Sequence, residues 1–91
     1  MPATINKFSV TTSAMLIAPA NPARQELIIT NAGVAPDAFL GPDSSVTSNT
    51  GLPLFAGQTR ERSRGFAIHL GDVYCITASG TADIRVWETS R

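Results

Sequence analysis

Short runs of alternating apolar and polar residues recur along the whole chain, and turn-forming residues separate them. The runs are rich in Ile, Val, Thr and Phe, while Gly, Pro, Asn and Asp interrupt them about every 8–12 residues. No stretch has the apolar spacing of an amphipathic helix. The pattern therefore predicts an all-β fold: a small antiparallel β-sandwich or jelly-roll-like barrel of about seven or eight strands.

The most regular strand of the first half is predicted over Gln25–Asn31, where Leu27 and Ile29 share one face. Ile28 lies on the opposite face among polar neighbours, so it either packs beneath a loop or is a contact point for a partner. Pro53 excludes Leu52–Phe55 from the centre of a sheet, because proline donates no ladder hydrogen bond. The other extended segments predicted before residue 64 are Lys7–Thr12, Ala14–Ala18, Phe39–Leu40, Ser45–Thr47 and Gln58–Ser63.

The last third of the chain predicts three consecutive strands, over Phe66–Leu70, Val73–Ala78 and Ala82–Trp87. In the last of them Ile84 and Val86 point one way, whereas Arg85 and Trp87 point the other way. One core cannot take both sets, so either Arg85 and Trp87 face outwards or the strand is covered on both sides. Trp87 therefore belongs to a protein interface, closes the end of the core, or stacks on a sugar ring.

The length of 91 residues predicts one domain, residues 1–91, and the polar start predicts that residues 1–6 form an N-terminal arm that reaches a neighbour. Charged residues make up 15% of the chain, against about 25% in typical soluble domains. Such a surface either packs against neighbouring proteins or stays soluble through its Thr, Ser and Asn residues.

The charge balance argues against nucleic acid and membranes as partners. Lys+Arg and Asp+Glu each count 7, so no global field attracts either partner, and no apolar run is long enough to span a membrane. One local cluster stands out, because Arg60, Arg62 and Arg64 share a face if their segment is extended. Three interpretations remain open for it: a solvated edge strand, a contact with carboxylates of another protein, or phosphate binding.

The chain offers little material for catalysis. His69 is the only histidine and Cys75 the only cysteine, and neither has a nucleophile motif or metal-ligand spacing around it. We expect His69 on the outward face of its strand and Cys75 as a buried thiol without a disulfide partner. Asp37 and Asp43 flank turns without the spacing of a calcium loop. We therefore predict no enzyme activity, no catalytic residue and no cofactor or metal site.

Three stretches together resemble the short β-sandwich structural proteins of tailed bacteriophage virions: Asn21–Asn31, Phe39–Gly57 and Tyr74–Glu88. The residues that carry the resemblance are those of turns and core, and they cover most of the chain from Asn21 onward. This family includes capsid decoration (cement) proteins as well as head-fibre and tail components. The resemblance implies a virion protein, assembled in the host cytoplasm, that sits at a symmetry axis as a homo-oligomer, with a trimer as the expected state.

These features predict a capsid decoration protein that bridges and stabilises neighbouring capsid subunits, with the major capsid protein or another virion protein as its partner. The alternative is a head-fibre or tail-tip module that recognises a host-surface glycan through Trp87 or Tyr74. The candidate partner-interface residues are Arg60, Arg62, Arg64, Arg85, Trp87, Ile28 and His69.

Overall fold

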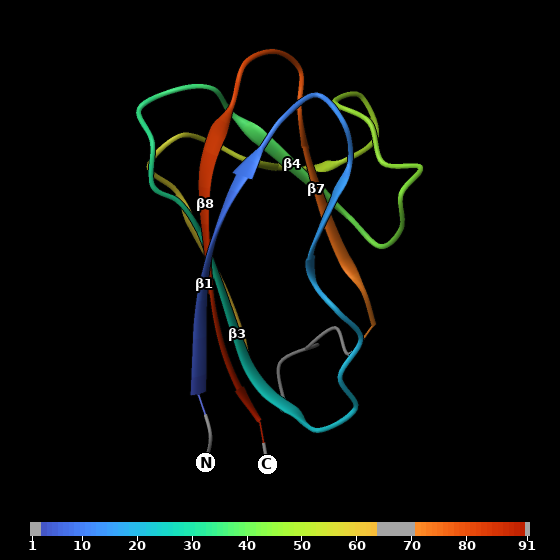
Figure 1. The fold of residues 1–91 in the computed structure, drawn as a ribbon, viewed down its shortest axis with the longest axis vertical. Helices are drawn as coiled ribbons and strands as arrows, with labels where there is room; N and C mark the ends of the chain where they lie inside the picture. Colours follow the sequence, from blue (N-terminus) through green and yellow to red (C-terminus); the bar gives the residue numbers. More distant parts are fainter. Residues whose placement is uncertain (1–2, 64–70, 91) are drawn as a thin grey trace.

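The described part of the chain forms eight β-strands in two four-stranded sheets, and it contains no helix (Figure 1). The structure is a computed structural model that describes residues 3–63 and 71–90. The strands are β1 (Ala3–Val10), β2 (Met15–Ala18), β3 (Arg24–Asn31), β4 (Ala38–Gly41), β5 (Leu52–Leu54), β6 (Thr59–Ser63), β7 (Val73–Thr77) and β8 (Ala82–Ser90).

Both sheets are antiparallel, and their strand order is that of a jelly roll. One sheet has the order β1-β8-β3-β6 and the other β2-β7-β4-β5. Each of the first four strands pairs with its counterpart from the second half: β1 with β8, β2 with β7, β3 with β6 and β4 with β5. These four pairings have the pattern of one long hairpin. The pairings of β3 with β8 and of β4 with β7 join the strand pairs into the two four-stranded sheets. The predicted small antiparallel sandwich is confirmed.

The core lies between the two sheets and follows the two-residue period of the strands. On β3 the buried residues are Leu27 and Ile29, and on β8 they are Ile84 and Val86, whereas the residues between them are more exposed. The predicted inner faces of both strands are therefore confirmed. β5, which contains Pro53, lies at the edge of its sheet, where a residue without an N–H breaks no central ladder.

β1 is longer at its start than the hydrophobic pattern predicts. Its pairing with β8 runs from Ala3 opposite Thr89 to Val10 opposite Ala82. Residues 3–6, predicted as an arm, therefore belong to the sheet, although all four remain exposed. The strand predicted over Phe66–Leu70 lies outside the described residues.

The extended segment predicted over Ser45–Thr47 is wrong, because these residues belong to the loop between β4 and β5. Within this loop Val46 is buried, and it packs against Gly41 at the end of β4. A Cβ atom on Gly41 would lie 2.5 Å from the Cβ atom of Val46. The absence of a side chain at Gly41 is therefore what lets the loop close over the sheet.

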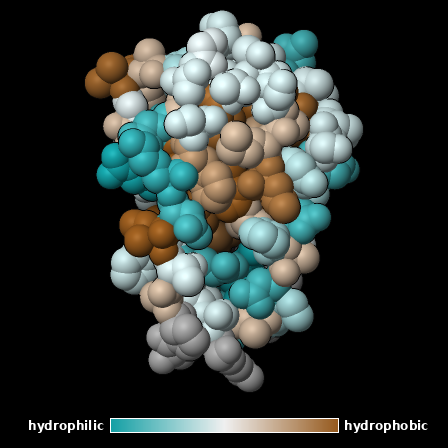
Figure 2. Space-filling view, viewed as in Figure 1, coloured by the Kyte–Doolittle hydropathy of each residue, from teal (hydrophilic) through white to brown (hydrophobic). Residues whose placement is uncertain are grey.

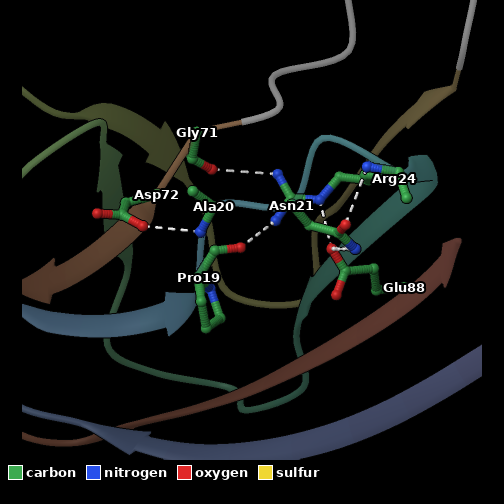
Figure 3. Close-up of polar contacts among 8 residues, drawn as sticks. Pro19, Ala20, Asn21, Arg24, Gly71, Asp72 and Glu88 are labelled. Carbon is green, nitrogen blue, oxygen red and sulfur yellow. Dashed lines mark hydrogen bonds and ion pairs between the residues drawn. The ribbon is translucent and has the colours of Figure 1, made fainter.

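Arg24 is a charged residue in the interior, and its guanidinium joins three other segments of the chain to β3 (Figure 3). Its Nε donates to the Glu88 carboxylate on β8, Nη1 donates to the Gly71 carbonyl at 3.2 Å, and Nη2 donates to the Pro19 carbonyl at 2.7 Å. The carboxylate balances the buried charge of Arg24, and the two carbonyls accept hydrogen bonds from other N–H groups of the guanidinium. The arrangement ties the β2–β3 loop and the residue two positions before β7 to strands β3 and β8.

Cys75 is a buried thiol, as predicted, and it is 0% exposed on β7. Burial raises its pKa to about 11, although hydrogen bonds from the backbone of Phe39 and Ile76 act in the opposite direction. The folded state therefore holds the thiol proton more tightly than the unfolded state does. This contribution to stability is complete below the ordinary pKa of 9.0, and it is lost as the pH rises through about 11.

We expect the stability of the protein to fall between about pH 9 and pH 11, and to fall less in Cys75→Ala. The measurement is the midpoint of urea unfolding at a series of pH values. The alanine variant has a cavity cost at every pH, so the informative quantity is the difference between the two proteins. Parallel pH profiles for the two proteins would rule out a contribution from the thiol.

Candidate protein interfaces

Charge separates the two sheets of the sandwich. The strands β2, β4, β5 and β7 contain no charged residue, so every charged residue of the eight strands lies in the other sheet. An antiparallel sheet that packs on one face commonly carries polar residues on its other face. The uncharged sheet departs from this rule, and because the centres of protein interfaces are depleted of charge, its outer face is a candidate interface.

We call this outer surface the uncharged face. Its side chains alternate with the core residues of the same strands: Leu16, Phe39, Pro53, Tyr74 and Ile76. Leu16 is 38% exposed, and the other four are partly exposed. The loop between β4 and β5 covers one part of the face, since a Cβ atom on Gly51 would lie 2.6 Å from the Cβ atom of Phe39. Leu16, on the edge strand β2, is the most exposed member.

The prediction of interface residues missed the uncharged face. A signal for it was present in the sequence, because Ala14–Ala18 and Val73–Ile76 are continuous apolar runs. Such runs indicate strands that are covered on both faces. Knowing that β2 and β7 are neighbours, however, requires the strand pairing.

The sheet with the order β1-β8-β3-β6 contains all the charged strand residues, and we call it the charged sheet. Its outer face carries a row of apolar residues at right angles to its strands. The register places Ile5 beside Trp87, Trp87 beside Ile28, and Ile28 beside Glu61. Ile5 is 62% exposed and Trp87 is 41% exposed, whereas Ile28 is half-buried between its neighbours. Trp87 therefore points away from the core and does not close its end. We call the outer surface of this sheet the tryptophan face. Its apolar and charged members are Ile5, Lys7, Glu26, Ile28, Glu61, Asp83, Arg85 and Trp87.

Two basic side chains lie on one side of the apolar row, and two carboxylates lie on its other side and at its end. Lys7 on β1 and Arg85 on β8 lie opposite each other in the strand register, one row above it. Glu26 lies one row below it on β3, and Glu61 ends the row itself on β6. Arg85 also donates to Asp83 at 3.1 Å, and this hydrogen bond lowers the pKa of the Asp83 carboxyl. Among the outward register positions with described side chains, Lys7 and Arg85 outnumber Asp83 on β1 and β8, and the charged residues on β3 and β6 are Glu26 and Glu61.

The open edge of the sandwich between β1 and β2 shows a further apolar area, in the middle of Figure 2. Phe8 on β1 and Met15 on β2 are partly buried and pack against the core. Hydrophilic residues border the area in this view. The area is therefore the margin of the core at an open edge, distinct from the two outer faces.

Three of the predicted interface residues come together on the tryptophan face: Arg85, Trp87 and Ile28. Arg60 and Arg62 instead lie on β6, which is the edge strand of its sheet. The Arg60 guanidinium donates twice to the Pro53 carbonyl, at 2.9 and 3.1 Å, and so links the edge strands β6 and β5 of the two sheets. The side chains of Arg62, Arg64 and His69 lie outside the described residues.

The carboxylates of the turns have structural partners. Asp37 accepts a hydrogen bond from the Ala56 amide at 2.9 Å, and Asp43 accepts one from the Ser45 amide at 2.9 Å. Both therefore stabilise loops, as aspartates in turns commonly do. Among the described residues, no group of three or more His, Cys, Asp and Glu is placed to hold a metal ion.

The two aromatic residues considered for glycan binding lie on different sheets. Trp87 is on β8 and Tyr74 on β7, and each points outwards from its own sheet. The two rings therefore do not form one platform for a sugar.

In the ranges 3–63 and 71–90, no helix is long and apolar enough to cross a membrane.

Comparisons with known proteins do not assign a family. No family model matches the chain. No curated protein and no solved structure matches it either.

Proposed function

We propose that the protein is a non-enzymatic structural protein of a tailed-phage virion, and that it decorates the capsid by bridging neighbouring subunits. The uncharged face carries this proposal, because a whole sheet without charge presents Leu16 and its apolar neighbours at the surface. Covering such a face stabilises a complex by about 25 cal/mol per Å² of apolar area. The likeness of the turn and core segments to virion proteins supplies the class of partner.

The mechanism of decoration is mechanical. A sandwich presents its two outer faces on opposite sides, so one copy can contact two partners at once. The uncharged face suits the major capsid protein, because a lasting contact buries its centre and excludes charge. Each contact adds buried area that must be exposed again before neighbouring subunits separate. The shell therefore becomes harder to open.

Leu16→Glu is expected to weaken binding to capsid shells by at least about 100-fold, because a carboxylate in the covered face loses its water without gaining a partner. The variant should still fold, since Leu16 is 38% exposed on an edge strand. Co-sedimentation of the purified protein with isolated capsid shells measures the binding. The matched control is Val34→Glu, which places the same charge at a loop position that is 98% exposed and should bind like the wild type.

Wild-type protein that stays in the supernatant at every shell concentration would refute capsid decoration. Equal binding by Leu16→Glu and the wild type would refute the role of the uncharged face. The exposed Trp87 ring favours the alternative, a head-fibre or tail-tip module that binds a host-surface glycan. A glycan array separates the two: binding that is lost in Trp87→Ala and kept in Tyr74→Ala would favour the glycan module.

A further inference from the structure

We infer that the tryptophan face pairs with the same face of a second copy of this chain across a two-fold axis. A two-fold contact uses the same patch on both subunits, so the patch must be complementary to itself. The tryptophan face meets this requirement, because Lys7 and Arg85 lie on one side of its apolar row whereas Glu26 and Glu61 lie on the other side and at its end. Such pairing is a property of the free protein, and it does not depend on binding to capsids.

The apolar row supplies the centre of the contact. Trp87 lies on β8, which has β1 on one side and β3 on the other, so the residue is not at the edge of the sheet. Ile5 and Trp87 are 62% and 41% exposed, and a second copy would cover both side chains. Tryptophan is enriched at the centres of interfaces, where it buries a large area at a small cost in side-chain entropy.

The positions of the charges define the axis. Neighbouring strands are about 4.8 Å apart, and residues on the same face of a strand are about 6.7 Å apart. On this lattice, the two-fold axis lies in the plane of the contact. It passes beside Trp87 and runs diagonally to the strands. Such an axis places Lys7 over Glu26 of the second copy. The same axis places Arg85 over Glu61 of the second copy and brings the two Trp87 rings together. The strands of the two copies then cross at near right angles, one of the two common geometries for packed sheets.

A two-fold pair fits this face better than the trimer that the sequence predicts. A ring of three subunits joins two different patches, whereas the positive and negative sides here belong to one patch. Where two four-stranded sheets cross at right angles, their overlap is about 19 Å wide in each direction, which gives roughly 400 Å² on each copy. The total of roughly 800 Å² is below the ~1,200–2,000 Å² of stable complexes, so the pair should dissociate on dilution.

Charge reversal tests the pairing directly. Lys7→Glu and Glu26→Lys should each weaken self-association by at least about tenfold, because each places like charges opposite one another twice. An equimolar mixture of the two variants should associate again, since every reversed charge then faces an opposite charge. Sedimentation at a series of concentrations measures the mass. The emission of Trp87, the only tryptophan, reports whether the ring itself becomes covered.

Two further variants make the test specific. Trp87→Ala should be folded by circular dichroism and monomeric, because the ring points outwards. Val34→Glu changes charge away from the face and should associate like the wild type. A wild type that is monomeric at every concentration would overturn the inference. So would a mixture of the two charge reversals that stays monomeric, or a trimer that both reversals leave intact.

Discussion

Replacing Arg24 with methionine is expected to lower the free energy of unfolding by about 3–5 kcal/mol, which is a large part of the stability of a small domain. Methionine fills much of the same volume, so the loss arises from polar groups rather than from a cavity. The Glu88 carboxylate, whose side chain is 19% exposed, loses its buried counter-ion. The carbonyls of Pro19 and Gly71 lose a charged donor at the same time, and hydrogen bonds to charged groups contribute more to stability than those between neutral groups.

Urea unfolding followed by circular dichroism measures the effect at a protein concentration low enough to keep the chain monomeric. The matched control is Arg85→Met, which also removes an arginine from an ion pair. The Arg85 and Asp83 side chains are 50% and 30% exposed, so water replaces their contact and stability should hardly change. A second variant, Arg24→Met with Glu88→Leu, should recover part of the loss because it removes both charges. Equal stability of Arg24→Met and Arg85→Met would contradict a structural role for the buried pair.

Gly41→Ala is expected to destabilise the protein by about 1–3 kcal/mol, the cost of overpacking a well-packed site. The new Cβ atom would lie 2.5 Å from Cβ and 2.6 Å from Cγ2 of Val46, closer than atoms of two side chains can approach. Either β4 or the loop over it must move. Because Val46 covers β4 from the outer side of its sheet, the same change also disturbs the uncharged face.

A double-mutant cycle with Val46→Ala distinguishes this contact from a general effect of alanine on β4. The single variant Val46→Ala loses apolar contacts and is itself less stable than the wild type. In the double variant the smaller side chain makes room for the new methyl group, so the combined loss should be smaller than the sum of the two single losses. Strictly additive losses would show that the two residues do not press against each other.

Local patterns in the sequence were sufficient to predict the class of the fold and the inner faces of its main strands. The alternation around Leu27, Ile29, Ile84 and Val86 predicted which side chains are buried, because neighbouring residues of a strand point to opposite faces wherever the strand lies. Pro53 predicted an edge position for the same kind of reason, since the missing N–H is a property of that residue alone. Cys75 was predicted as buried from the apolar run around it.

The buried arginine shows where local rules fail. Arg24 carries a charge, and charged residues are almost never fully buried unless they are paired. The partner that allows its burial, Glu88, lies at the other end of the chain. Arg60 is similar, because its contact with the Pro53 carbonyl depends on two edge strands of different sheets meeting.

The sequence by itself thus determined that the protein is a β-sandwich and which side of several strands faces the core. Only the tertiary structure decided which strands are neighbours, and therefore that all strand charges lie in one sheet and that Ile5, Trp87 and Ile28 form one row. The physical reason is that periodicity is a property of a single strand, whereas a surface is made by several strands. Their order and register result from contacts between segments far apart in the chain.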